Sequence, residues 1–228
     1  MGLQHVEFFH ISHFENNYHR VKPAPALTSF IDFFWETRFD DLLEQHPKGF
    51  SDALFPNIGY TYLFNLGTPF IMQVGDKKFE MKTDGFLPRN RAIECYHQQG
   101  NRLFGIKFKI SPVIFKTRVN FAEYKEFIYP LSYLMEQPVI DDAKQAPRFE
   151  DRVTILNRYF ESIVEAYGGS WQPIRIVTAI LDHCDHNNDF TTSIEVFAEQ
   201  YGISARTLHR YFETTTSLSS KKALQVMR

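Results

Sequence analysis

Hydrophobic and polar residues in the first part of the chain follow the pattern of β-strands. Between residues 55 and 109, short stretches rich in aromatic and β-branched residues are separated by turn residues, roughly every eight to twelve positions. The segment from Lys77 to Lys82 alternates polar and apolar side chains, which is typical of a half-buried strand. Several short strands at this spacing predict an antiparallel barrel or sandwich.

The second part of the chain has a helical period. Apolar residues recur over residues 149–167 as they do in an amphipathic helix, which Gly168 and Gly169 would end. We place a domain boundary there, so that residues 1–168 form a β-rich sensing or dimerisation domain with C-terminal helices and residues 169–228 form a helical domain. The predicted fold class is α+β, with an N-terminal antiparallel β barrel or sandwich followed by an all-α domain.

Three further segments complete this division of the chain. Apolar side chains at residues 27, 30, 31 and 34 follow helical spacing, and residues 33–39 have the pattern of a strand, which together predict a short helix running into a strand. Residues 40–48 are rich in charge and are followed by Gly49, so we expect a surface loop. Residues 137–147 form a polar patch punctuated by prolines.

Residues 192–212 have the pattern of a helix, a tight turn and a second helix. Gly202 stands where the first helix ends, because a glycine adopts positive φ without a steric clash. Ser204 follows as an N-cap, where its hydroxyl can accept a hydrogen bond from an open backbone N–H of the second helix. On that helix the polar side chains lie away from the apolar Leu208 and Phe212. This is the arrangement of a helix-turn-helix, whose second helix enters a DNA major groove. The alternative is an ordinary helical hairpin in an all-α core.

Residues 171–228 resemble the first part of the DNA-binding domain of the AraC/XylS family of transcription regulators. The matching run covers residues 193–212 and continues through Ser217-Leu218-Ser219-Ser220-Lys221-Lys222. In that family two helix-turn-helix units are joined by a long helix. The resemblance therefore implies a domain truncated after its first helix-turn-helix, because the chain stops at Arg228. A weaker likeness over residues 55–70 and 105–112 implies an N-terminal sensing or dimerising module and names no ligand.

The candidate DNA-binding residues are polar or basic side chains of the second helix and the segment after it. They are Ser204, Arg206, Thr207, His209, Arg210, Lys221 and Lys222. Either arginine of the helix could bind a guanine edge or a phosphate, and the two lysines are expected to bind phosphates rather than bases. The alternative is that the polar side chains of the helix are merely solvated and that the two lysines are a solvated surface pair. From Ser204 onward five cationic residues stand against Glu213, a net charge of +4, although the whole chain carries −2. This distribution favours DNA binding.

The function predicted from these residues is that of a sequence-specific DNA-binding transcription regulator. Its partners would be double-stranded DNA, a small-molecule effector and a second copy of the chain as a homodimer. The alternative is a ligand-binding or protein-interaction module in which the truncated DNA-binding half is inert. The apolar stripe of residues 149–167 could form the dimer face, or it could pack on the β domain.

Aromatic residues indicate where an effector would bind. The chain has 23 Phe and 11 Tyr, which predicts an aromatic core, an apolar pocket or both. The pocket candidates are Tyr60, Tyr62, Phe64, Arg89, Tyr96 and His97. The alternative for each of them is a packed core without a ligand.

Other classes of protein are not favoured by the sequence. Cys95 and Cys184 lie far apart and match no metal or redox spacing, and His97 has no H-x-H neighbour. The chain has no glycine-rich phosphate loop and no nucleophile motif. We therefore expect no enzyme activity, no cofactor and no metal. The N-terminus lacks the pattern of a signal peptide, and no stretch approaches the ~20 apolar residues of a membrane span, so we expect a cytoplasmic protein without a membrane partner.

Overall fold

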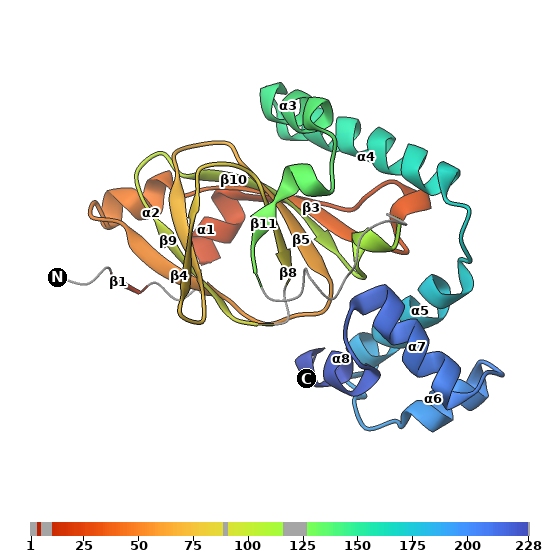
Figure 1. Cartoon of the computed structure of the whole chain (residues 1–228). Coiled ribbons are helices and arrows are strands. Elements are labelled where there is room, and N and C mark those ends of the chain that lie inside the picture. The colour runs from red at the N-terminus through yellow and green to blue at the C-terminus, as the bar shows by residue number, and fades with distance from the viewer. Residues whose placement is uncertain (1–3, 6–10, 89–90, 116–126, 228) are drawn as a thin grey trace.

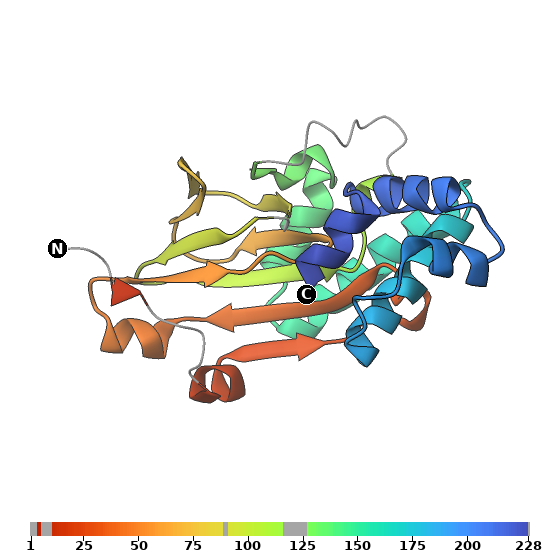
Figure 2. The same ribbon diagram turned by 90° about the horizontal axis from the view of Figure 1, so that it is seen from below.

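Two β-sheets packed face to face form the N-terminal part of the protein, which we call the sandwich (Figure 1). The computed structural model describes residues 4–5, 11–88, 91–115 and 127–227. The outer face of one sheet is covered by α3 (Gln137–Gln145) and α4 (Phe149–Ala166). The helices of residues 172–227 pack at the end of the sandwich remote from α2 (Asp40–Gln45), as Figures 1 and 2 show. The predicted α+β class, a β domain followed by helices, is confirmed.

The first sheet has the strand order β1-β4-β9-β6-β7, and the second has the order β11-β8-β5-β10-β3-β2. The strands of the first sheet are β1 (Gln4–His5), β4 (Phe50–Leu54), β9 (Ile93–His97), β6 (Phe70–Val74) and β7 (Lys77–Met81). Those of the second are β11 (Tyr129–Pro130), β8 (Gly85–Pro88), β5 (Tyr60–Asn65), β10 (Arg102–Phe108), β3 (Ile31–Arg38) and β2 (Tyr18–Val21). The described pairings are antiparallel except for that of β1 with β4.

The second sheet is buried on both faces because helices cover one side and the first sheet covers the other. Along β5, Tyr60, Tyr62 and Phe64 belong to the core beneath α3 and α4, whereas Leu63 belongs to the core between the sheets. Successive side chains of a strand point to opposite faces, so one strand contributes to both cores. This explains the continuous burial of β5, which lacks a solvent-facing side.

Helix α4 confirms the predicted amphipathic helix over residues 149–167. Its buried residues Val153, Leu156 and Phe160 pack in the core of the second sheet. The stripe therefore packs on the sandwich, which is the alternative to a dimer face. The chain enters α4 from α3, where Pro138 occupies the first turn and Ile140 and Ala143 are buried. Residues 137–147, for which the sequence indicated only a polar patch punctuated by prolines, thus consist mainly of a helix.

The predicted short helix running into a strand is confirmed with shifted bounds, as the 3-10 helix η1 (Pro25–Leu27) and then β3. The strand begins at Ile31, earlier than predicted, because β10 and β2 pair with its two edges. One other expectation is wrong. The expected loop over residues 40–48 instead contains α2, whose Leu42 and Leu43 are buried between the sheets. Short elements complete the sandwich: α1 (Ile11–Asn16), η2 (Pro112–Phe115) and η4 (Leu131–Tyr133).

The last four labelled helices form a separate core, and we call this part the helical unit. They are α5 (Gln172–Asn187), α6 (Ile194–Gln200), α7 (Ala205–Thr216) and α8 (Ser220–Met227). Leu208 and Phe212 of α7 are fully buried against residues of α5 such as Ile180. One residue of the sandwich, Ile58, belongs to the same core.

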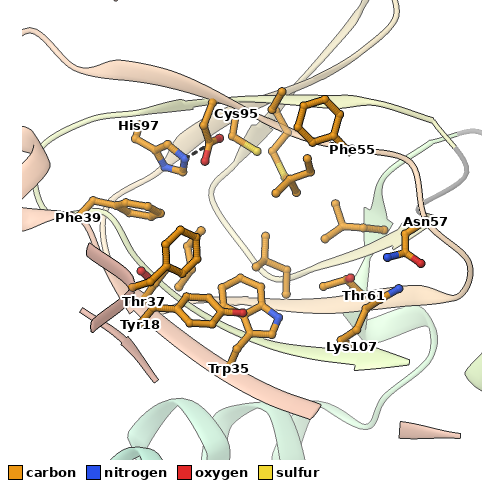
Figure 3. Close-up of a pocket in the computed structure, with 18 of the residues that line it drawn as sticks. Tyr18, Trp35, Thr37, Phe39, Phe55, Asn57, Thr61, Cys95, His97 and Lys107 are labelled. Atoms are coloured by element: carbon orange, nitrogen blue, oxygen red, sulfur yellow. Dashed lines mark hydrogen bonds and ion pairs between the residues drawn. The ribbon is translucent and has the colours of Figure 1, made fainter. Parts of the chain in front are cut away.

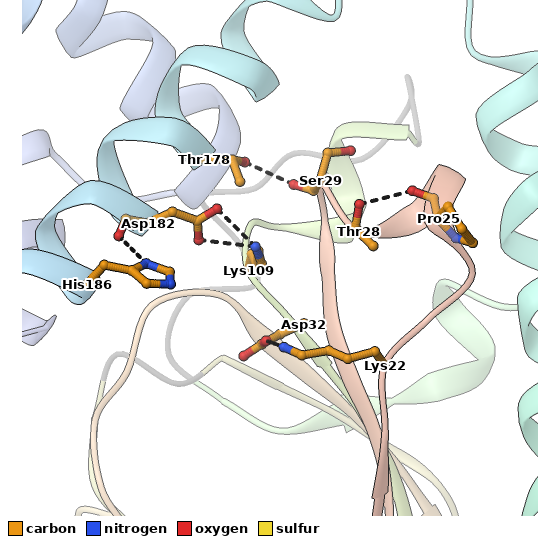
Figure 4. Close-up of polar contacts among 9 residues, drawn as sticks. All are labelled: Lys22, Pro25, Thr28, Ser29, Asp32, Lys109, Thr178, Asp182 and His186. Carbon is orange, nitrogen blue, oxygen red and sulfur yellow. Dashed lines mark hydrogen bonds and ion pairs between the residues drawn. The ribbon is translucent and has the colours of Figure 1, made fainter.

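Polar contacts also join the helical unit to the sandwich (Figure 4). The Thr178 hydroxyl donates to the Ser29 carbonyl at 2.9 Å, and the Lys109 ammonium lies 3.1 Å from both carboxylate oxygens of Asp182. The Ser111 amide donates to the Thr215 carbonyl at 2.6 Å. Within the described residues, none of the helices has the length and apolar character needed to cross a membrane.

Candidate functional site

Three residues, Ser193, Gly202 and Ser204, mark the ends of α6 and α7 through contacts with residues close to them in the chain. The Ser193 hydroxyl caps α6 by accepting from the Val196 amide, and the Ser204 hydroxyl caps α7 by accepting from the Thr207 amide at 3.1 Å. Gly202 has φ +62°, and a Cβ there would meet no atom within 4 Å. The glycine is therefore required by backbone conformation rather than by crowding. The predicted cap and turn glycine are both confirmed.

The loop before α6 is fixed by Asp189. Its carboxylate accepts from the Thr192 hydroxyl at 2.6 Å and from the Thr191 amide at 3.0 Å. These hydrogen bonds hold the pKa of Asp189 well below its usual range, so the carboxylate remains charged at neutral pH. The loop thus keeps α6 at a defined angle to α5.

Helix α7 has one buried face and one exposed face. Arg206 and Arg210 lie one turn apart on the exposed side, opposite the buried Leu208 and Phe212. On α8, Lys221 and Lys222 are both exposed at the first turn.

The other predicted DNA-binding residues have structural partners. The Ser204 and Thr207 hydroxyls lie 2.9 Å apart within the α7 cap. The Nδ1 atom of His209 lies 2.6 Å from the hydroxyl of the buried Ser220, which joins α7 to α8. The histidine is nevertheless exposed as a whole residue. Arg206 and Arg210 are thus the exposed basic residues of α7, whereas His209 also joins α7 to α8.

A second candidate site is a cavity of about 370 Å³ between the two sheets (Figure 3). Its wall is mainly aromatic and aliphatic, and it includes Phe33, Trp35, Phe39, Leu63, Met72, Leu87, Cys95 and Leu103. Polar side chains stand at two ends: Figure 3 places His97 and Cys95 at one end and Asn57 and Lys107 at the other. Phe55, also on the wall, is 75% exposed, so the cavity reaches the surface beside it. Such a space suits a small, mainly apolar molecule.

The structure brings only part of the predicted pocket together. His97 lines the cavity, whereas Tyr60, Tyr62 and Phe64 face the opposite side of β5 and fill the core beneath α4. Tyr96 lies on the outer face of β9, where its hydroxyl donates to Gln73 at 3.2 Å. Arg89 lies outside the described residues. Tyr60, Tyr62 and Phe64 are therefore core residues and do not line the pocket, because helices cover the face of the sheet on which they lie.

The residues missed by sequence reasoning come mainly from β3, β4 and the following loop. Phe33, Trp35 and Thr37 alternate along β3 and all face the cavity. The sequence predicts a strand over residues 33–39, but a strand pattern alone does not show that one of its faces lines a cavity. Asp52 and Cys95 were also missed, although Cys95 stands two positions before His97 on one strand.

One loop connects the cavity to the helical unit. Residues 54–57 line the cavity, and the next residue, Ile58, packs in the helical core. Gly59 then has φ +85°, and a Cβ there would lie 2.0 Å from the Phe108 carbonyl oxygen, so the loop passes tightly against β10. Lys107 lines the cavity, and its ammonium donates a hydrogen bond of 2.5 Å to the Ile58 carbonyl.

A polar cleft of about 310 Å³, which we call the junction cleft, separates the sandwich from the helical unit beside this loop. Its charged lining residues are Arg20, Lys22, Asp32, Lys107, Lys109, Asp182 and Asp185. Asn57 and Lys107 line both this cleft and the cavity. The two spaces therefore share a wall that also holds the loop.

Comparison with known proteins gives only remote likenesses. No protein-family model matches the chain, and no curated protein sequence matches it. Among solved structures, the AraC-like transcriptional activator CuxR is 11% identical, with 94% of this chain and 86% of that chain covered and a TM-score of 0.32. ToxT from Vibrio cholerae is 8% identical, with 92% and 97% covered and a TM-score of 0.30. ToxT from Vibrio cholerae O395 bound to (E)-4-(8-methylnaphthalen-1-yl)but-3-enoic acid is 9% identical, with 93% and 98% covered and a TM-score of 0.29.

Proposed function

We propose that the protein is a DNA-binding transcription regulator whose helical unit responds to a small, mainly apolar ligand bound between the sheets. The observation that carries the proposal is the exposed face of α7, where Arg206 and Arg210 stand one turn apart on a helix held by its caps and its buried face. A rigid helix with free arginines can enter a major groove and form bidentate hydrogen bonds with guanine edges.

Electrostatics supports this assignment of α7. The excess of positive charge from Ser204 onward lies on α7 and α8, where Arg206, Arg210, Lys221 and Lys222 are exposed. The surplus acidic residues of the chain lie elsewhere, so the protein as a whole would not coat DNA without specificity. In this proposal the lysines bind phosphates and set the register of α7.

The loop of residues 54–58 supports a regulatory role for the cavity. A ligand in the cavity would contact residues 54–57, and their displacement would move Ile58, which is packed in the helical core. Because packed cores have discrete arrangements rather than continuous ones, a small shift at the cavity can change how the helical unit sits. The ligand would then alter DNA affinity by its different affinity for the two arrangements.

The test of DNA binding uses the full chain. Genomic fragments retained by the immobilised protein would be sequenced, and affinity for the enriched fragment would be measured by fluorescence anisotropy at two salt concentrations. We expect Arg206→Ala and Arg210→Ala to weaken specific binding by roughly 5- to 150-fold, the loss of one good base contact. Arg158→Ala, an exposed arginine of α4, is the matched control and should leave affinity unchanged.

Two results would contradict the proposal. Equal affinity of the α7 variants and the control would exclude α7 as the reading helix. An absence of enriched fragments, together with ligand binding in the cavity, would favour the alternative of a ligand-binding module whose helical unit does not bind DNA.

Ligand binding is measured in a separate experiment by the fluorescence of Trp35, which lines the cavity. A Trp171→Phe background leaves Trp35 as the only tryptophan.

A further inference from the structure

Three metal-binding side chains meet on the wall of the cavity. One ligand atom from each of Asp52, Cys95 and His97 lies within 4.8 Å of the other two, and all three residues are buried. The strand register produces this meeting. Cys95 and His97 are two positions apart on β9 and therefore share a face, and Asp52 of β4 is the direct cross-strand partner of Cys95.

The orientation of His97 is fixed by a second set of contacts. Its Nδ1 atom lies 2.5 Å from Oδ1 of the buried Asn101, whose amide nitrogen is turned toward the Thr68 carbonyl at 3.5 Å. Nδ1 therefore carries the hydrogen and donates it to Asn101. The other nitrogen, Nε2, faces the Asp52 carboxylate at 3.2 Å. A histidine that binds a metal is held in this way, with one nitrogen donating to an oxygen acceptor and the other facing the ion.

A cation is needed between these groups to satisfy both. A neutral imidazole would direct the lone pair of Nε2 at a carboxylate oxygen, which is repulsive. A metal ion between the two atoms removes this repulsion. A divalent ion with one carboxylate, one thiolate and one neutral imidazole has no net charge, which is the condition under which burial costs least.

The surroundings of the three residues suit a metal site. The rings of Phe39, Phe50 and Phe70 lie 4.1, 4.9 and 5.7 Å from the His97 ring, between centroids, so the imidazole has mainly aromatic neighbours. All three residues of the cluster also line the cavity. An apolar shell strengthens the interactions of an ion with its ligands.

We propose that Asp52, Cys95 and His97 bind a divalent transition metal of the zinc class, with the remaining coordination position facing the cavity. A tetrahedral zinc ion would place its ligand atoms about 3.3 to 3.6 Å apart. The longest separation in the cluster must therefore shorten by about 1.5 Å at most, through rotation of the side chains. Three protein ligands and one open position match zinc sites that also bind an exogenous group. The inference does not depend on DNA binding.

The experiment is a titration of the full chain with Co²⁺ after treatment with a chelator, followed by displacement with Zn²⁺. We expect one equivalent of Co²⁺ to bind with a thiolate-to-metal charge-transfer band. Cys184→Ser is the matched control, because it leaves Cys95 as the only thiol and should keep the band. Cys95→Ser should abolish the band, and Asp52→Asn should weaken Co²⁺ binding by roughly 10-fold or more.

The outcomes separate the proposal from its rivals even if a cavity variant fails to fold. Loss of the band in Cys184→Ser would overturn the proposal, since that variant leaves the cluster intact. Uptake without a thiolate band would indicate exposed histidines such as His183, whose Nε2 lies 3.9 Å from Asp189. No uptake by the unsubstituted protein would overturn the proposal and leave the contact between His97 and Asp52 as a structural one.

Discussion

The Lys109 ammonium lies 3.1 Å from both carboxylate oxygens of Asp182, and this ion pair joins the sandwich to α5 of the helical unit. The pair borders the junction cleft, so it is partly exposed on both sides. Two hydrogen bonds also cross this junction: the Thr178 hydroxyl donates to the Ser29 carbonyl, and the Ser111 amide donates to the Thr215 carbonyl. Together with Ile58, which is packed in the helical core, these few polar contacts fix the position of the helical unit on the sandwich.

Asp182→Asn is therefore predicted to loosen the docking of the helical unit while changing the free energy of unfolding by less than about 1 kcal/mol, because partly exposed ion pairs contribute little. Amide hydrogen exchange at Ser111 is the measurement, since that amide donates to Thr215 across the junction. It should become faster in the variant. Asp185→Asn, which removes the same charge from an exposed site on α5, is the control. Equal exchange rates in the two variants would refute the role of the ion pair.

Gly105→Ala is predicted to reshape the cavity. Gly105 of β10 is the cross-strand partner of Trp35, and a Cβ there would lie 2.3 Å from the indole ring. The ring must move, so we expect a loss of about 1 to 3 kcal/mol in the free energy of unfolding and a shifted emission spectrum of Trp35. Chemical denaturation and fluorescence in the Trp171→Phe background measure the two effects. Gly168→Ala, where a Cβ meets no atom within 4 Å, should change neither.

Glu36 forms ion pairs with two arginines, Arg102 at one carboxylate oxygen and Arg152 at the other. Its carboxylate accepts from Arg102 at 2.5 Å and from Arg152 of α4 at 3.1 Å, and both Glu36 and Arg152 are almost fully buried. Burial lowers the pKa of Arg152, and the adjacent Glu36 carboxylate opposes that shift.

Removal of the carboxylate alone leaves a buried cation without its counter-charge. Glu36→Ala is therefore predicted to reduce the free energy of unfolding by about 3 to 5 kcal/mol, measured by urea denaturation. The double change Glu36→Leu with Arg152→Leu should be less harmful than Glu36→Ala, because no buried charge then remains between β3 and α4. The exposed Glu165 of α4 serves as control, and its replacement by Ala should have little effect. A double variant as unstable as the single one would show that packing, not charge, dominates.

Tyr62 makes the protein sensitive to alkaline pH. Burial raises the pKa of Tyr62 well above its ordinary value of 10.0, so the phenol ionises in the unfolded chain before it ionises in the folded protein. The unfolded state then binds fewer protons above pH 10, and stability falls as pH rises through that range. The expected contribution of Tyr62 is about 1.4 kcal/mol per pH unit.

Urea denaturation between pH 9 and pH 11 tests this prediction. Tyr62→Phe should reduce the pH slope by that amount, whereas Tyr133→Phe, at an exposed position, should leave it unchanged. An identical slope in the Tyr62 variant and the unsubstituted protein would mean that other groups, such as Tyr159, govern alkaline unfolding. The pKa of Tyr159 is also raised by burial and by its hydrogen bond to Glu136.

The features that the sequence predicted correctly depend on neighbouring residues. The cap by Ser204, the positive φ of Gly202 and the amphipathic α4 arise from hydrogen bonds and periodicity within a few turns of chain. The errors arose where distant segments decide. Strand β3 begins at Ile31, before the predicted residue 33, because two other strands pair with it. Helix α2 forms because its two leucines are buried in the apolar space between the sheets.

The candidate sites divide in the same way. Sequence alone determined that α7 carries two arginines on the side away from its apolar residues, because helical geometry fixes that relation. Only the tertiary structure decided which face of β5 meets the cavity, since alternation leaves both faces open until α3 and α4 cover one of them. It likewise decided that Asp52 stands opposite Cys95, because strand register joins residues that no local pattern connects.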